Sequence, residues 1–355
     1  MYKIDEGTCI DCGVCKKTCA FQRHDVKNKD YNLPEVYAAR HRDNEVLKNS
    51  SSGGAFTAIS DFVLENSGVV YGVSFDEKFN LVYKKAETKK ERDKFRGSKY
   101  SQSSLKDTFI DVKKDLERDV LVLFVGTPCQ VDGLKSFLGN RCQDNLILCD
   151  LVCHGASSPL IWQEHIKSIK KYISKNINSY KFRDKNYGWR GVNVTLQYDN
   201  TKNQSNTNLL RTYSNLYFQS LITRPSCHNC KYTNLNRVSD ITIGDFWGIE
   251  KCMPEFDDNK GMSLILVNTE KGTRVFNSVK HDLIYKKSNV DDCLQPQLQH
   301  PDKPSLNRKY FWGDYKNKGY NYVIKKYAGY GFKNKVKSIV IIGLQKSRLI
   351  NFLKK

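Results

Sequence analysis

The chain has 355 residues, 12 cysteines and a formal net charge of +20 at pH 7. This length buries a sizeable core, and the start of the chain has no signal-like apolar stretch, so we expect a cytoplasmic protein with reduced thiols rather than a disulfide-stapled secreted domain. The basic charge favours anionic partners, but it is spread along the chain without a recognisable RNA- or DNA-binding motif, so we expect no nucleic acid.

The first cysteines form a tight run with C-x2-C-x2-C-x3-C spacing: Cys9, Cys12, Cys15 and Cys19. This spacing lets one short loop wrap several thiolates around a cubane, whereas tetrahedral zinc prefers two separated pairs. It predicts a small ferredoxin-like [4Fe–4S] module, which with its polar linker spans residues 1–31. In two-cluster ferredoxins the fourth cysteine serves the other cluster and precedes proline, but here Ala20 follows, so the role of Cys19 stays open.

The next part of the chain alternates between strand-like and helix-like patterns. The predicted strands are residues 35–41, 69–75, 120–126, 146–153, 192–198, 241–246 and 262–268. The predicted helices are residues 53–66, 105–117, 131–138, 159–172 and 271–281. The alternation predicts an α/β body over residues 32–308, with a mixed sheet, flanking helices and part of the sheet parallel.

A second, dispersed set of cysteines lies in this body. Cys129 follows one predicted strand, and Cys153 stands at the end of the next. Ligands collect outside the carboxyl ends of strands in an open α/β sheet, so these two thiols are expected to approach one another. Cys227 and Cys230 add a C-x2-C pair. The spacing alone fits zinc, a redox disulfide or a cluster.

Several long motifs occur in order between residues 34 and 307: SSSGGAF, RGSKY, GTPCQVDGLK, DLVCHG, RPSCHNCKY and SDITIGDFWGIE. This region resembles the coenzyme F420 hydrogenase/dehydrogenase beta-subunit family, in particular bacterial members associated with polysaccharide biosynthesis. The resemblance implies a flavin, usually FAD, and one cluster held by Cys129, Cys153, Cys227 and Cys230. Many members carry two ferredoxin-type runs, whereas this chain has one, and the use of deazaflavin coenzyme F420 stays open.

In the context of this family, several polar residues become candidates for the flavin site. Ser51, Ser52, Gly53 and Gly54 precede a predicted helix whose free N–H groups suit a phosphate, with Thr57 one turn further; an ordinary N-cap is the structural alternative. Lys99 offers a cation and Tyr100 a ring for stacking, although an exposed turn also explains them. Thr127, Gln130 and Asp245 lie near predicted strand ends and are further candidates, with a capping role as the alternative for Asp245.

His154 directly follows Cys153 and is our candidate proton donor, or a hydrogen-bond donor that tunes the cluster, although a lone histidine is more often structural. Arg183, with Trp189 nearby, forms a patch that suits an anionic substrate or a salt-bridged turn. The basic tail, residues 309–355, carries an apolar stripe for packing on the body or for peripheral membrane contact.

We therefore predict an oxidoreductase that passes electrons between a ferredoxin-like carrier and an anionic or sugar-type substrate through FAD. The alternative is a non-enzymatic binding protein, stabilised by zinc or by a cluster, whose basic surface engages nucleic acid, membrane or glycan-pathway partners.

Overall fold

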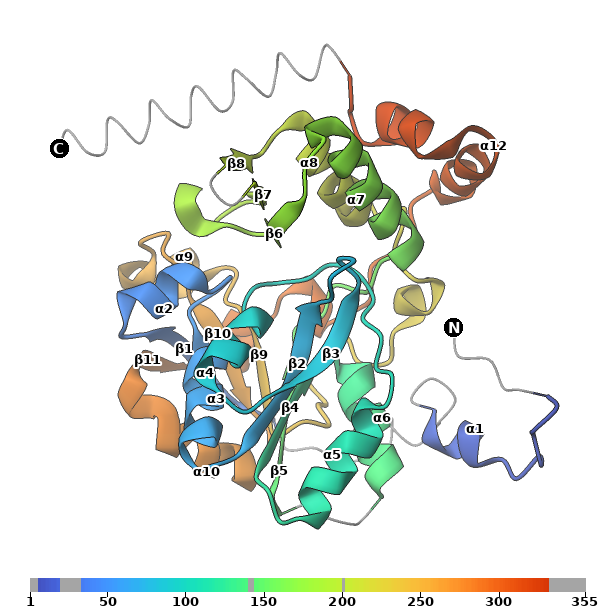
Figure 1. Ribbon diagram of the computed structural model, residues 1–355. Helices are drawn as coiled ribbons and strands as arrows, with labels where there is room; N and C mark the ends of the chain where they lie inside the picture. The colour runs from blue at the N-terminus through green and yellow to red at the C-terminus, as the bar shows by residue number, and fades with distance from the viewer. Residues whose placement is uncertain (1–5, 20–32, 140–143, 200–201, 332–355) are drawn as a thin grey trace.

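The computed structural model describes residues 6–19, 33–139, 144–199 and 202–331 (Figure 1). Its centre is an eight-stranded sheet in the order β11-β1-β10-β9-β5-β4-β2-β3. The strands are β1 Glu35–His41, β2 Val69–Phe75, β3 Leu81–Ala86, β4 Val122–Gly126, β5 Leu146–Leu151, β9 Ile241–Asp245, β10 Ser263–Val267 and β11 Leu283–Ser288. Strands β2, β4, β5 and β9 are parallel, and the remaining pairings are antiparallel. The predicted mixed, partly parallel sheet is confirmed.

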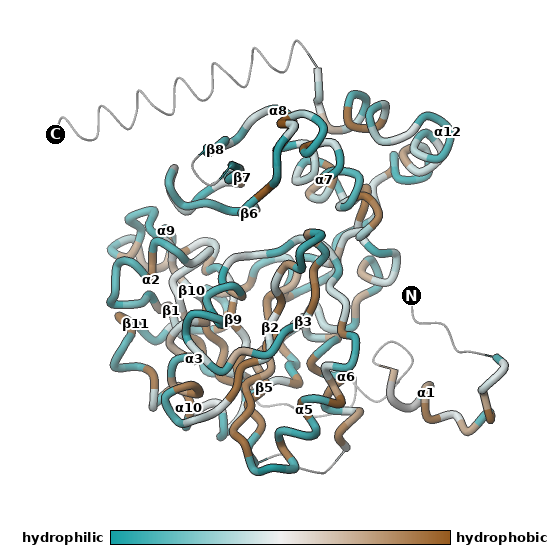
Figure 2. Tube along the Cα trace, viewed as in Figure 1, coloured by the Kyte–Doolittle hydropathy of each residue, from teal (hydrophilic) through white to brown (hydrophobic). Residues whose placement is uncertain are grey.

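Helices cover both faces of this sheet. On one face lie α3 (Ala55–Glu65) and α10 (Glu270–Val279), and on the other lie α5 (Thr108–Glu117) and α6 (Pro128–Leu138). The sequence of strand β4 is almost wholly apolar because both of its faces are buried: Leu123 packs towards α3, and Phe124 packs towards α5 and α6. Figure 2 shows the corresponding apolar segments along β2 and β5.

The shorter elements lie between these units. The helices are α1 Val14–Thr18, α2 Asn44–Asn49, α4 Lys89–Arg92, α9 Ile249–Cys252 and α11 Val290–Cys293. The 3-10 turns are η2 Asp93–Phe95, η3 Lys185–Tyr187, η4 Pro225–Asn229, η5 Pro254–Phe256, η6 Lys280–Asp282 and η7 Pro296–Leu298.

A second lobe is inserted between β5 and β9, although these two strands are neighbours in the sheet. It contains α7 Pro159–Ile173, β6 Ile177–Lys181, β7 Thr195–Tyr198, β8 Lys202–Ser205 and α8 Asn208–Phe218, and it is joined by α12 Arg308–Tyr327. Its core is rich in aromatic rings, with Trp162 and Tyr213 fully buried. In Figure 1 this lobe lies above the sheet.

The ends of the chain are described in part. Helix α1 lies beside α6 (Figure 1), and residues 20–32, which include the predicted linker, lie outside the described residues. Helix α12 covers the start of the predicted basic tail, and its Phe311 and Ile324 are buried against the second lobe. The apolar stripe predicted further along falls within residues 332–355, outside the described residues. Among the described residues, no helix combines the length and apolar character that crossing a bilayer requires.

Candidate functional site

Four thiols come together at the carboxyl ends of β4 and β5: Cys129, Cys153, Cys227 and Cys230. Cys129 lies in the first turn of α6 directly after β4, Cys153 follows β5, and the C-x2-C pair lies at η4. Burial raises the pKa of the Cys129 thiol to about 11. Burial, and then the nearby thiols of the other three cysteines, raise the pKa of Cys153 well above its usual value. Contacts of the Gly155–Ala156 segment with Cys153 and Cys227, together with the influence of all three other thiols on Cys153, put these cysteines in one region, which we call the four-thiol site.

Peptide N–H groups point at the sulfurs of the four-thiol site. Gly155 donates to Cys153 Sγ at 3.3 Å, and Ala156 donates to Cys227 Sγ at 3.5 Å. Gly155 has φ +107°, and a Cβ there would lie 2.8 Å from Thr223 Cγ2, so the turn that carries these donors requires glycine. Hydrogen bonds to sulfur stabilise thiolates and tune the potential of a cluster that they hold.

A buried ion pair joins the two segments that carry these cysteines. Arg237 donates to Asp150 Oδ1 at 2.9 Å and to the carbonyl of Leu151 at 2.9 Å, and the two side chains are 1% and 0% exposed. The same guanidinium donates to the carbonyl of Tyr232 at 2.7 Å. Arg237 therefore ties the end of β5, just before Cys153, to the loop that follows the C-x2-C pair.

The charge of this guanidinium also reaches the sulfurs. Burial raises the pKa of Cys230, and Arg237 offsets part of that rise. Our sequence reasoning missed both partners of the ion pair. The available signal was Asp150 itself, because a carboxylate inside an apolar strand needs a buried partner.

His154 is oriented by a carboxylate that is distant in sequence. Its Nε2 lies 2.9 Å from Asp302 Oδ2, and its ring lies against Tyr217 with centroids 5.6 Å apart. The carbonyl of Asp302 also lies 2.9 Å from His228 Nδ1, within the C-x2-C pair. Asp302 thus contacts both histidines that neighbour the cysteines. The assignment of His154 as a proton donor stays a prediction, now with an orienting group that the sequence had not indicated.

The serine–glycine loop before α3 is engaged with the sheet. The hydroxyl of Ser51 accepts the N–H of Ser98 at 2.8 Å, and that of Ser52 donates to the carbonyl of Met262 at 2.8 Å. Gly53 donates to Ser263 Oγ at 2.9 Å, and a Cβ on Gly53 would lie 2.3 Å from the carbonyl oxygen of Ala39. These contacts support the structural alternative for the loop, and its phosphate-binding role stays a prediction.

The next predicted flavin residues are also held by protein groups. Gly54 is the N-cap of α3 with φ +93°, and Thr57 Oγ1 accepts from Arg96 Nε at 3.1 Å. The Lys99 ammonium donates to three carbonyls around η2, at 3.0 to 3.1 Å. Burial lowers the pKa of Lys99 to about 7, so its charge changes near neutral pH. Lys99 here stabilises the end of a helical turn.

Tyr100 and Asp245 meet where the second lobe approaches the sheet. The ring of Tyr100 stacks on Tyr217 with centroids 4.8 Å apart. The Asp245 carboxylate accepts from the Arg183 guanidinium and, at 2.6 Å, from Trp189 Nε1. Both carboxylate oxygens of Asp245 therefore accept hydrogen bonds from protein groups. The charged patch predicted at residue 183 is a largely buried salt bridge between the two lobes.

Thr127 and Gln130 form the capping box of α6 around Cys129. Gln130 Oε1 accepts the N–H of Thr127 at 3.1 Å, and Gln130 Nε2 donates to Ser103 Oγ at 3.0 Å. The Thr127 hydroxyl lies 3.3 Å from Cys129 Sγ. Gln130 therefore connects the four-thiol site to the segment that runs along the free edge of β3.

The N-terminal run is more open than the four-thiol site. Cys9, Cys12 and Cys15 are exposed, Cys19 is half-buried, and the N–H of Asp11 donates to Cys9 Sγ at 3.4 Å. Within the described residues, no three histidine, cysteine, aspartate or glutamate side chains converge closely enough to hold a single metal ion. The chemistry of both cysteine sets, soft thiolates with N–H donors at sulfur, suits iron–sulfur clusters.

Comparisons with known proteins identify a family for this chain. Two family models describe the beta subunits of coenzyme F420 hydrogenase/dehydrogenase: the model of their N-terminal part matches residues 36–108, and the model of their C-terminal part matches residues 119–292. Solved structures also match, including a chain of "the F420-reducing [NiFe] hydrogenase complex from Methanosarcina barkeri" studied by xenon derivatization. That chain is 16% identical with a TM-score of 0.49, over 86% of this chain and 96% of that chain. A comparison with curated proteins gave no match.

Proposed function

Because the chain belongs to the coenzyme F420 hydrogenase/dehydrogenase beta-subunit family, we propose that it is an iron–sulfur flavoprotein oxidoreductase. In this proposal it passes electrons between a ferredoxin-like carrier and a substrate through FAD. The observation that supports it most directly is the four-thiol site, in which cysteines from three separate segments share one half-buried region.

The residues around the four-thiol site match what a cluster needs from a protein. A [4Fe–4S] cluster held by these thiolates supplies one-electron transfer. The N–H groups of Gly155 and Ala156 stabilise negative charge on two of the sulfurs, and the buried guanidinium of Arg237 adds a positive charge. The rings of Tyr217, which is buried, and Phe218, which is exposed, lie beside His154 with centroids 5.6 Å away.

The flavin is the finer part of the proposal. FAD is the group that joins one-electron to two-electron chemistry in such enzymes. Three predicted flavin residues lie next to the four-thiol site: Thr127, whose hydroxyl is 3.3 Å from Cys129 Sγ, Gln130, which follows Cys129, and Tyr100, which stacks on Tyr217. A sugar-type substrate and a cytoplasmic location belong to the proposal on the strength of the family resemblance and the cysteine usage.

Iron and acid-labile sulfide counts on anaerobically purified protein test the proposal. Cys227→Ser and Cys9→Ser are each expected to lose about half of the iron, if each cysteine set holds one cluster. Cys252→Ser is the matched control, because this half-buried thiol lies outside both sets, packs on the edge of an apolar cluster and donates to the carbonyl of Gly248 at 3.8 Å. Fluorescence of released cofactor measures the flavin separately.

Two results would overturn the proposal. An unchanged iron content in Cys227→Ser would show that the four-thiol site holds no cluster. A colourless, zinc-loaded preparation would instead support the zinc-stabilised binding protein, because zinc also accepts four thiolates.

A further inference from the structure

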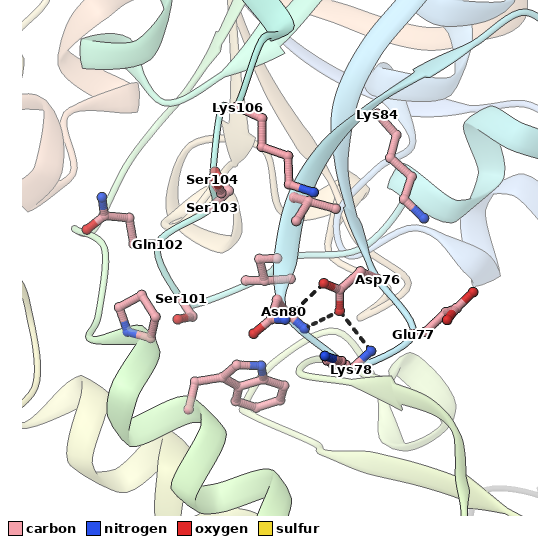
Figure 3. A pocket seen from close by; sticks show the side chains of 14 residues that line it. Asp76, Glu77, Lys78, Asn80, Lys84, Ser101, Gln102, Ser103, Ser104 and Lys106 are labelled. Carbon is pink, nitrogen blue, oxygen red and sulfur yellow. Dashed lines mark hydrogen bonds between the residues drawn. The ribbon is translucent and has the colours of Figure 1, made fainter. Parts of the chain in front are cut away.

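A groove of about 810 Å³ lies along β3, the strand at one end of the sheet, and is separate from the four-thiol site (Figure 3). Its walls are the turn before β3, the strand itself, residues 101–106 and the first turn of α7. The volume is typical of pockets that hold small molecules. Ser104 pairs with β3 through a bridge to Val82 and hydrogen bonds with Leu81 and Tyr83, whereas Ser101 and Gln102 pair with Ser157. Backbone contacts at both ends therefore hold this wall in place.

The groove has an excess of free positive charge. Lys78, Lys84 and Lys106 line it and form no ion pair with any described residue. Of the two carboxylates in the lining, Asp76 is committed to its own turn, where it accepts the N–H groups of Lys78 at 2.9 Å and of Asn80 at 2.8 Å (Figure 3). Three ammonium groups therefore stand against two carboxylates, Asp76 and Glu77, and the charge of Asp76 reaches Lys106. The lining keeps a net charge of +1, three minus two, and this balance favours an anionic ligand.

Neutral donors lie at the other end of the groove. Helix α7 is 15 residues long and starts at Pro159, which lines the groove, and its N-cap residue makes no side-chain capping hydrogen bond. The free N–H groups and positive end of such a helix attract anions. Ser101 also lines the groove and is only 7% exposed, and its buried hydroxyl interacts with the Tyr213 hydroxyl without a hydrogen bond of standard geometry. A buried hydroxyl of this kind calls for a ligand or a water.

The groove shares a wall with the redox site. Ser103, in the lining, accepts from Gln130 Nε2 at 3.0 Å, and Gln130 directly follows Cys129. Tyr100, which stacks on Tyr217 beside His154, directly precedes Ser101. A ligand in the groove would therefore lie one layer of side chains from the four-thiol site.

We propose that this groove binds an organic phosphate, held by Lys84, Lys106, Ser101 and the start of α7. The same chemistry has two sources, the diphosphate of the flavin or a phosphorylated substrate. The inference rests on the proposed function only for the first source, because phosphate binding itself requires neither a cluster nor a flavin.

The probe is inorganic pyrophosphate, titrated calorimetrically into the full-length protein. Lys84→Ala/Lys106→Ala is expected to weaken binding roughly tenfold, as the loss of two exposed charge contacts allows. Lys167→Ala/Lys171→Ala is the matched control, because it removes the same charge from residues of α7 that do not line the groove. Ser101→Ala removes a hydroxyl near Tyr213, whose own hydroxyl keeps its hydrogen bonds to Ser157 and to the carbonyl of Tyr100. The variant is therefore expected to weaken binding without changing the thermal midpoint.

The flavin content of the same variants separates the two sources. Flavin lost from the groove variant and retained in the control identifies the flavin diphosphate. Unchanged flavin with lost pyrophosphate binding identifies a substrate phosphate. Pyrophosphate binding that depends on the two lysines in a protein without flavin keeps this inference and refutes the flavin in the proposed function. Equal pyrophosphate affinity and equal flavin content in groove and control variants, or no pyrophosphate binding to any variant, would overturn the inference.

Discussion

Replacing Arg237 by methionine is expected to destabilise the protein by about 3–5 kcal/mol, which is the usual cost of removing one partner of a buried ion pair. The side chain of Asp150 is completely buried, so its carboxylate would be left without a compensating charge. Arg237 also donates to the carbonyls of Leu151 and Tyr232, and methionine supplies none of these hydrogen bonds. The loss therefore falls on the link between the two cysteine-bearing segments.

Urea unfolding at pH 7.5, followed by tryptophan fluorescence, measures this cost. Arg190→Met is the matched control, because it makes the same chemical change at an exposed ion pair with Glu250 and should cost less than about 1 kcal/mol. The double variant Arg237→Met/Asp150→Leu should recover most of the loss, because no buried charge is left unpaired. Iron content should fall in the single variant, since the C-x2-C loop is no longer tied to β5.

The pH dependence gives a second test with a definite sign. Burial raises the pKa of Asp150, and Arg237 holds it down. Without the arginine the folded-state pKa rises further, so the folded protein binds a proton that the unfolded chain has released. The penalty of Arg237→Met should therefore be largest at high pH and shrink as the pH falls through the raised folded-state pKa. A loss below about 1 kcal/mol at pH 7.5, or a loss that neither acid nor the double variant reduces, would refute this reasoning.

Three further predictions concern backbone fit and acid stability. Gly155→Ala should lower the thermal midpoint and the iron content, because its Cβ would overlap Thr223. The control Gly191→Ala has φ +93° and no neighbour within 4 Å of the new Cβ. It should lose only about 1 kcal/mol of stability through backbone strain and keep its iron. Gly53→Ala should destabilise by more than about 2 kcal/mol through backbone overlap, whereas Gly133→Ala, whose nearest neighbour is 3.6 Å away inside α6, should be neutral or stabilising in the same urea assay. Burial lowers the pKa of His165 to about 3, so below about pH 6.5 the unfolded chain binds a proton that the folded protein does not bind. The free energy of unfolding should therefore fall by about 2 kcal/mol between pH 7.5 and 5. Thermal melts at both pH values should show a smaller fall in His165→Phe.

The predicted fold was correct where burial dictated the sequence pattern. Strands β2, β4 and β10 are buried along most of their length, so their apolar runs identified them. Strands β3 and β11 lie at the two edges of the sheet and carry exposed lysines, which interrupt the pattern of apolar residues, and we did not predict either. Helix α8 also escaped prediction, because its buried face is built from tyrosines as well as leucines.

The cysteines of the site could be identified from the sequence, but the residues that hold and orient them could not. The strand ends indicated that Cys129 and Cys153 approach one another, and the family resemblance added Cys227 and Cys230. Asp302 and Arg237 could not be assigned, because their partners His154 and Asp150 are far away in sequence and only the fold brings them together. Gly53 shows the opposite problem, since the same glycine signal fits a phosphate loop and a close approach between backbone segments, and here it meets Ala39.

The insertion of the second lobe between β5 and β9 has a consequence for synthesis of the protein. Cys129 and Cys153 leave the ribosome well before the C-x2-C pair, and β1 must wait for β10 and β11 before it can pair. Contacts this distant in sequence slow folding, and the early thiols stay open to oxidants during that delay. A metal centre held by all four thiols could therefore form only after the C-x2-C pair has left the ribosome.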